Sequence, residues 1–286
     1  MPFHCAGLIV RWVLAAALLC GARLRADTHV YAGAVSTNVG SQLLFSNGAL
    51  FDATRGPVAL PQVLRTNGLN AGYYRGDALT FSALPAFPEN GGPVAFHAAL
   101  GARLAVRVVS VEGPAGGSFG FWEGDGESDL GVLTFSDPVG TRDGQHRLVV
   151  SENLGEPGSD PYGHIHGRQF TSRGEGMYVV GFQLIDLSSN GPDGGPLHAP
   201  SDILRIRFQA GPRIESLVKE PDRVNVQFRS PPGISNVVEA ARSVVGEAWL
   251  PVGNPVRGNN GLQSLSLTNL PPGDWFFRLR QLNNLP

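Results

Sequence analysis

The density of glycine and proline limits this chain to short elements of secondary structure. Of its 286 residues, 38 are glycine and 22 are proline, which together make up about a fifth of the chain, well above average usage. Both residues interrupt helices and central strands and are favoured in turns. No stretch of about a dozen residues has its apolar side chains at helical spacing. The sequence therefore predicts an all-β protein of many short strands joined by turns.

Short runs rich in Val, Phe, Tyr and Leu recur through much of the chain, each bounded by Gly, Pro, Asn or Asp. This composition favours strands that end at turns. We expect strands over residues 29–31, 43–45, 94–97, 104–109, 118–122, 132–135, 147–150, 166–171, 178–184 and 203–208. Their simplest arrangement is a β-sandwich, in which the apolar faces of two sheets pack together.

A domain boundary is expected near Gly211 and Pro212. The strands predicted beyond it cover residues 224–228, 235–240, 249–252, 262–267 and 275–279. So many strands in so short a segment suit a small sandwich of the fibronectin type III kind. Residues 27–211 carry 11 basic and 18 acidic side chains, whereas residues 212–286 carry 8 and 6. We therefore predict a β-sandwich domain over 27–211, followed by a smaller fibronectin type III-like domain over 212–286.

The N-terminus has the pattern of a signal peptide. Arg11 precedes an apolar run at residues 12–20 that is too short to span a bilayer. We expect residues 1–26 to be removed and the protein to be exported to the periplasm, the cell surface or the medium. Both cysteines, Cys5 and Cys20, lie in this segment. The mature chain is therefore expected to lack disulfides and thiolate metal sites.

Charge and hydropathy argue against two classes of partner. The formal net charge is −2, whereas proteins that bind the phosphate backbone of nucleic acids are usually basic. Beyond the signal peptide, no segment is long and apolar enough to cross a bilayer. We therefore expect no nucleic-acid partner and no transmembrane anchor in the mature chain.

Two alternating histidines form the main candidate site. On a strand, the side chains of His164 and His166 project from one face about 7 Å apart. Imidazole nitrogens suit copper or zinc, and two of them can converge on one ion when a third ligand is supplied from elsewhere. This spacing predicts a transition-metal site. The alternative is that both histidines are structural residues that form hydrogen bonds beside turns.

His29 can supply the third ligand in one of three ways. If the signal is cut after residue 26, the sequence Asp27-Thr28-His29 offers an amine, two amides and an imidazole in a square-planar set for Cu(II) or Ni(II). If His29 lies in the first strand, it can join His164 and His166 in one three-histidine site. If the cut follows Thr28, His29 becomes the N-terminal residue, as in copper-dependent polysaccharide oxidases.

The remaining features of interest lie in loops and strands elsewhere. His198 precedes a predicted strand, so it can reach the end of a sheet as a fourth ligand, and its alternative is a solvated loop histidine. We expect His97 to be a core residue and His146 a turn residue. Four carboxylates in residues 123–129 could bind Ca²⁺, but they lack the spacing of an EF-hand, which favours a solvated acidic turn.

The motif around the histidine pair resembles a domain of bacterial surface-anchored proteins. The residues that carry the resemblance are Gly163, His164, Ile165, His166, Phe170, Gly176, Tyr178 and Phe182. The resemblance covers most of residues 27–211 and is to the choice-of-anchor and actinobacterial surface-anchored type, with similar proteins in verrucomicrobia. This chain departs from the family pattern at Gln169, where an aromatic residue is usual. The chain ends at Pro286 without a sorting motif, so we expect release or periplasmic retention.

The resemblance also implies a role. In actinobacteria such proteins are encoded beside metal-type ABC transporters, which implies metal handling, with a metal transporter or a cell-surface component as partner. We therefore predict an exported, non-enzymatic protein that binds copper or zinc through His164, His166, His29 and His198. The competing hypothesis is a surface adhesion or interaction module whose histidines are structural. A copper-dependent oxidative enzyme is the third hypothesis.

Overall fold

The computed structural model describes residues 29–56, 59–65, 68–76, 79–86, 97–123, 132–165, 169–230, 234–245, 248–259 and 261–282. In these residues the regular elements are β-strands and two short 3-10 helices, η1 (Gly48–Leu50) and η2 (Pro192–Gly194). The all-β fold class is thereby confirmed. Neither helix in this part of the chain is long and apolar enough to cross a membrane. The predicted signal peptide, residues 1–26, lies outside the described residues.

The strands of the described chain are short, as the turn-forming residues predict. In chain order they are β1 (His29–Ala34), β2 (Leu43–Phe45), β3 (Leu60–Leu64), β4 (Tyr74–Gly76), β5 (Thr80–Ala83), β6 (Leu104–Glu112), β7 (Ser118–Glu123), β8 (Val132–Pro138), β9 (Arg147–Val149), β10 (Gly163–His164), β11 (Gln169–Arg173), β12 (Gly176–Asp186), β13 (Leu204–Ala210), β14 (Arg213–Lys219), β15 (Arg223–Arg229), β16 (Ser235–Ala241), β17 (Leu250–Arg257), β18 (Leu262–Thr268) and β19 (Phe276–Leu282).

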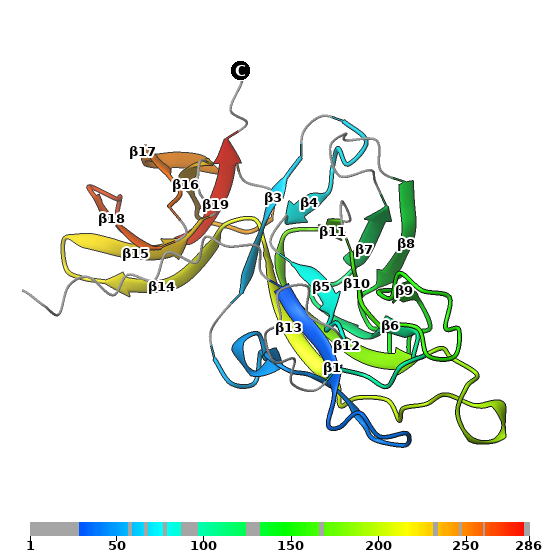
Figure 1. The fold of residues 1–286 in the computed structure, drawn as a ribbon. Coiled ribbons are helices and arrows are strands. Elements are labelled where there is room, and N and C mark those ends of the chain that lie inside the picture. The colour runs from blue at the N-terminus through cyan, green and yellow to red at the C-terminus, as the bar shows by residue number, and fades with distance from the viewer. Residues whose placement is uncertain are drawn as a thin grey trace, which may run out of the picture.

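Strands β1 to β13 form two sheets (Figure 1). One has four strands in the order β10-β5-β1-β2, and the other has nine in the order β8-β7-β11-β4-β3-β13-β12-β6-β9. The larger sheet curls on itself: the rings of Phe119 in β7 and Phe208 in β13 lie 4.8 Å apart, although three strands separate them in the sheet. A bridge between Ser110 in β6 and Arg142 ties the segment after β8 back to β6. The curled sheet thus surrounds an aromatic interior.

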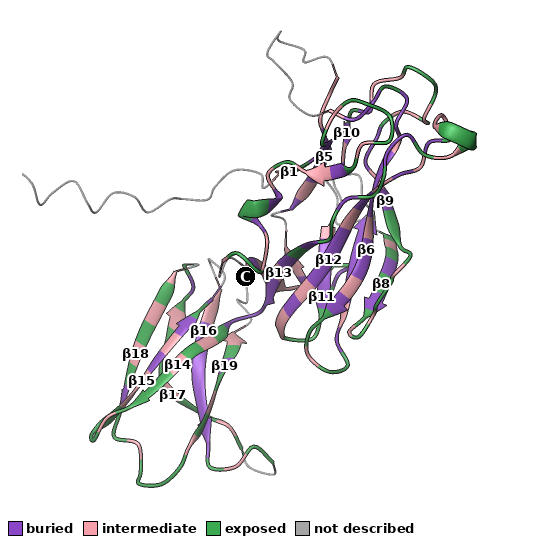
Figure 2. Cartoon of the chain, turned by 90° about the horizontal axis from the view of Figure 1, so that it is seen from below, coloured by how far each residue is buried: buried purple, intermediate pink, exposed green. Residues whose placement is uncertain are grey.

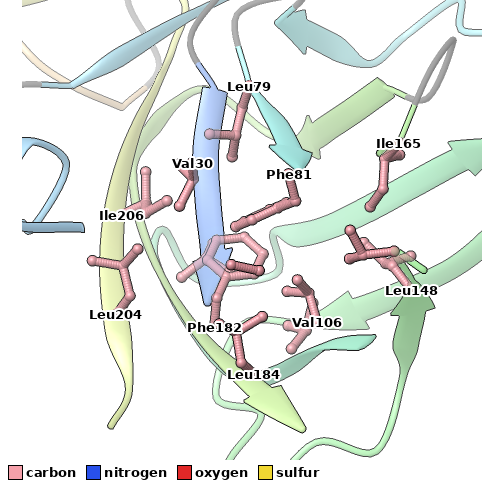
Figure 3. Packing of buried hydrophobic residues seen from close by; sticks show 14 of the residues in the cluster. Val30, Leu79, Phe81, Val106, Leu148, Ile165, Phe182, Leu184, Leu204 and Ile206 are labelled. Carbon is pink, nitrogen blue, oxygen red and sulfur yellow. The ribbon is translucent and has the colours of Figure 1, made fainter. Parts of the chain in front are cut away.

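The four-stranded sheet packs its inner face against this curled sheet (Figure 3). Val30 of β1 and Phe81 of β5 point toward β12, where the ring of Phe182 lies 5.2 Å from that of Phe81. All three side chains are fully buried, and each contributes roughly 1.5–3 kcal/mol through the apolar area removed from water. Because side chains alternate along a strand, the neighbours of Val30 and Phe81 project from the opposite, outer face.

Strands β14 to β19 form two three-stranded sheets, in the orders β14-β15-β18 and β17-β16-β19. Their core is a cluster of buried residues separate from that of the first two sheets: Val226, Phe228, Val238, Leu267 and Leu279. Figure 2 shows buried residues gathering inside each of the two groups of sheets. The chain passes from one group to the other at Gly211, whose positive φ of 75° glycine adopts without strain.

Most of the predicted strands are present, with their ends shifted by a few residues. Strands β3, β4, β5, β10 and β14 were not predicted. Of the strand expected over 166–171, residues 169–171 lie in β11, and residues 166–168 lie outside the described part. Of the strand expected over 94–97, only His97 is described, and it lies in irregular backbone, so that prediction is wrong at His97.

Candidate metal site on the four-stranded sheet

Strand β5 lies between the two strands that carry His29 and His164. His164 pairs with Ser82 across the β10–β5 ladder, and His29 pairs with Thr80 across the β1–β5 ladder. The side chains next to them in sequence point inward, so His29, Ser82 and His164 project from the outer face of the sheet. Tertiary pairing thus brings the first strand and the histidine motif to either side of Ser82.

His29 is oriented by a hydrogen bond to Ser82. Its Nδ1 lies 2.8 Å from the Ser82 Oγ, and its ring stacks on that of Tyr31 with 6.0 Å between centroids. Ser82 is only 7% exposed, so this bond is shielded from water. With Nδ1 protonated, His29 donates to Ser82, and Nε2 carries the lone pair. Metal-binding histidines are commonly held this way, with one nitrogen hydrogen-bonded and the other on the ion.

His164 has polar partners at the same ring nitrogen. Its Nδ1 lies 3.2 Å from the Tyr162 hydroxyl and 3.5 Å from a carboxylate oxygen of Glu152. A carboxylate beside Nδ1 raises the basicity of the imidazole and fixes its orientation, which improves the other nitrogen as a metal ligand. Tyr162 continues the alternation of His164 and His166 by one step, so the sequence pattern could have identified it. No such signal points to Ser82 or Glu152.

His198 lies apart from these residues and binds backbone groups with both ring nitrogens. Its Nδ1 donates to the Ser41 carbonyl at 2.9 Å, and its Nε2 accepts the Ala99 N–H at 2.8 Å. The side chain is 2% exposed, so the solvated loop histidine suggested as its alternative is wrong. Both nitrogens are already used, so His198 would have to give up one of these bonds to bind a metal ion.

A buried carboxylate holds the loop that carries His198. Asp186, at the end of β12, accepts backbone N–H groups from Arg103, Ser188, Leu197 and His198, at 2.9–3.2 Å. Four such bonds to one carboxylate satisfy N–H groups that would otherwise be unpaired away from water. The loop is therefore a braced structural element.

The third histidine of the predicted set, His166, lies outside the described residues. Among the residues that are described, no three His, Cys, Asp or Glu side chains are grouped so that they could hold a metal ion. The described part of the site thus contains His29 and His164, with Glu152 beside the second. A three-histidine site depends on His166.

Two other histidines have structural partners. His97, partly buried, lies with Nδ1 2.7 Å from the Ala98 carbonyl. His146 precedes β9, where its Nδ1 lies 2.8 Å from a carboxylate oxygen of Asp137, and its ring stacks on Phe135 at 4.6 Å. The sequence gives no sign of this pair, because Asp137 and His146 lie on opposite sides of a turn. Residues 124–129 of the acidic stretch lie outside the described chain.

Comparison with protein-family models gives no match, and comparison with curated proteins gives none either. The resemblance to bacterial surface-anchored domains therefore rests on the sequence motif around His164.

Proposed function

We propose that this is an exported, non-enzymatic protein that binds copper or zinc on the outer face of the four-stranded sheet. The ligands are His164 and His166 of the motif, with His29 of β1 as the third. The observation that supports the proposal most is the placement of His29 and His164 on either side of Ser82. A role in metal handling at the cell surface or in the periplasm, with a metal transporter as partner, follows from the resemblance.

The donor set fits the metals proposed. Imidazole is a good ligand for both Cu(II) and Zn(II), and carboxylate oxygen is acceptable to zinc. Ser82 at one ring and Tyr162 with Glu152 at the other engage Nδ1 of each histidine, so the same nitrogen of each imidazole, Nε2, becomes the ligand. Two inter-strand spacings, about 10 Å, separate β1 from β10, so an ion held by both imidazoles would tie three strands together.

Of the three placements considered for His29, the strand placement has the most support. His29 is the first residue of β1, and its Nδ1 is engaged with Ser82. Coordination by the sequence Asp27-Thr28-His29, or by His29 as an N-terminal residue, would compete with this arrangement. Intact-mass analysis of the exported protein separates these two terminal arrangements, because the first requires Asp27 and the second requires His29 as the first residue, whereas the strand placement requires neither.

Metal content by mass spectrometry tests the proposal. The full exported chain is purified without a histidine tag, exposed to Cu(II) and Zn(II), and passed through a desalting column. We expect about one equivalent of metal, lost in the His164→Ala/His166→Ala variant, whose circular dichroism stays that of the wild type. His146→Ala is the matched control, because His146 is a half-exposed histidine outside the site.

No bound metal after exposure to both ions would overturn the proposal. The adhesion or interaction module would then be the better hypothesis. Its structural histidines predict a different result for the double variant: a lower unfolding midpoint without any change in metal content.

A further inference from the structure

A second candidate site lies on the outer face of the curled sheet. A groove of about 840 Å³ runs over β6, β12 and the segment that follows β8, and it shares no residue with the histidine site. The side chains that matter to its chemistry are Arg107, Ser110, Arg142, Gln183, Ile203 and Arg205. Its volume is within the range of sites that hold small molecules or short oligomers.

The floor of the groove is a row of residues that crosses three strands. Arg142 pairs with Ser110 in β6, Ser110 with Gly181 in β12, and Gly181 with Arg205 in β13. A Cβ at position 181 would lie 2.4 Å from the Ser110 hydroxyl, so only glycine lets Ser110 cover β12 at this point. The middle of the row therefore carries only small side chains. An arginine lies at each end, and the backbones of these two arginines are about 14 Å apart, which is three inter-strand spacings.

None of the three arginines of the groove forms an ion pair with a carboxylate in the described part of the chain. Arg107 donates from Nη2 to the Gln183 amide oxygen at 2.6 Å, and its buried Nε has no hydrogen-bond partner there. Arg142 and Arg205 are exposed, and neither forms an ion pair with a described residue. Arg205 does help to lower the pKa of Asp52, after the larger effects of burial and of the hydrogen bonds from Thr54.

The positive charge of the groove is unusual in an otherwise acidic part of the chain. Residues 27–211 carry 11 arginines against 18 acidic residues, yet three of those arginines line one groove. Glu112 and Asp143 also line it, so the groove as a whole has one excess positive charge. Guanidinium groups that form no ion pair and that project from one face of a sheet suit carboxylate or sulfate groups, which they bind with paired hydrogen bonds.

The backbone around the groove favours a carbohydrate over a peptide. Peptides commonly bind a sheet by adding a strand to a free edge. Here β12 is paired on one side with β6 and on the other with β13, so its backbone groups are already used. Recognition must come from side chains: guanidinium groups, the hydroxyls of Ser110 and Thr141, and the half-exposed Ile203 for the apolar face of a sugar ring.

We propose that this groove binds an acidic oligosaccharide whose sugar rings carry carboxylate or sulfate groups. In this arrangement Arg142 and Arg205, whose backbones stand three inter-strand spacings apart, hold charged groups on separate rings. Arg107, which is held in place by Gln183, contacts the middle of the bound oligosaccharide. The protein would thus attach to an acidic polysaccharide independently of the histidine site.

Isothermal titration calorimetry of the full exported chain tests the proposal. The probes are a short oligogalacturonate, its methyl ester, a sulfated neutral oligosaccharide, a glutamate peptide of equal charge, and inorganic sulfate. We expect the oligogalacturonate or the sulfated chain to bind, and whichever binds identifies the charged group. We expect the uncharged methyl ester to bind at least tenfold more weakly.

Matched variants locate the site. Arg205→Gln should weaken binding roughly tenfold, the size expected for one charge-assisted pair. Arg257→Gln removes the same charge from an exposed arginine of β17 and should leave affinity unchanged. His164→Ala should also leave it unchanged, which separates this proposal from metal binding.

Three results would overturn the proposal. The first is binding of neither charged oligosaccharide. The second is binding of the peptide or of inorganic sulfate as tight as that of the oligosaccharide. The third is an equal loss of affinity in Arg205→Gln and Arg257→Gln, which would show that only net charge is sensed.

Discussion

Glu239 is a buried carboxylate between two arginines of the neighbouring strand. It is 3% exposed in β16, and its oxygens lie 2.9 Å from Nε of Arg278 and 2.5 Å from Nε of Arg280 in β19. Trp249 covers one of these guanidinium groups, with 4.5 Å between Arg278 and the ring centre. Burial raises the pKa of Glu239, but the hydrogen bonds and charges of Arg280 and Arg278 outweigh it, so the pKa lies below its usual 4.5.

This lowered pKa predicts a loss of stability in acid. A carboxylate whose pKa is lower in the folded state stabilises that state above the pKa of the unfolded chain, about 4.5, and the stabilisation disappears as pH falls through the folded value. We expect the free energy of unfolding to decrease as the pH is lowered from 4.5. Glu239→Gln should lower it at pH 7 by about 1–3 kcal/mol and remove most of the acid dependence.

Urea unfolding followed by tryptophan fluorescence from pH 7 to pH 3 measures both effects. Glu220→Gln is the control, because Glu220 forms an ion pair with Arg223 at the surface and should matter little. A variant with the same acid dependence as the wild type would show that another carboxylate is responsible.

Substitution of His198 and of His164 should change stability and metal content in opposite proportions. His198→Ala leaves the Ala99 N–H and the Ser41 carbonyl buried without partners, so we expect a loss of about 1–3 kcal/mol in the free energy of unfolding and no change in metal content. His164→Ala should cost less stability, because its partners Tyr162 and Glu152 are exposed to water, and should reduce metal content. Urea unfolding and metal analysis of both variants test this, and a reversed pattern contradicts it.

At the scale of elements, β5 shows how far the sequence could predict the site. The alternation of His164 and His166 is a local pattern, and the first strand is a local apolar run, so both were found. Strand β5 is only four residues long, with serine and threonine in it, and it forms because β1 and β10 pair with its two sides. Such pairing depends on tertiary packing, which can override weak local preference. Ser82, and the pairing of β5 with both β1 and β10, could not be predicted for this reason, although a place for His29 in the first strand as a partner of His164 is among the alternatives that the sequence suggests.

Packing of β5 therefore supports the histidine site. Phe81 is fully buried against Phe182, Phe170 and Phe45. Phe81→Ala should lower the free energy of unfolding by about 3–5 kcal/mol, the range for loss of a buried phenylalanine. It should also reduce metal content, since β5 separates the two histidine strands. Phe81→Leu, which keeps the position apolar, should lose less stability and less metal.

Hydrogen exchange and metal analysis of the Phe81→Ala protein together distinguish a local effect on β5 from a general loss of folding. Hydrogen exchange should be faster in β1, β5 and β10 of the Phe81→Ala protein, while β15 and β16 stay protected. Full metal content in a protein whose β5 exchanges freely would show that the ion does not depend on this sheet.

At the scale of the whole molecule, the two separate cores are linked at one titratable cluster. Burial raises the pKa of Glu175, which lies in the turn before β12, and the effect exceeds the opposing ones of a hydrogen bond from Tyr74 and of the charge on Arg278. Burial and the charge of Glu175 in turn raise the pKa of Tyr74 to about 12. Tyr74 lies in β4 and Arg278 in β19, so Glu175 interacts with residues from both groups of sheets.

The raised pKa of Glu175 predicts a stability effect of opposite sign to that of Glu239. A carboxyl whose pKa is higher in the folded state than the unfolded 4.5 favours folding below 4.5, and this advantage is lost as pH rises through the folded value. Glu175→Gln keeps an acceptor for the Tyr74 hydroxyl but carries no charge. We expect this variant to match the wild type at pH 4 and to be the more stable protein at pH 7, by a small margin because Glu175 is partly open to water. Urea midpoints at the two pH values measure the difference. A variant that is less stable at pH 7 would show that attraction between Glu175 and Arg278 outweighs the cost of burying the carboxylate, and that this charge pair stabilises the contact between the turn before β12 and strand β19.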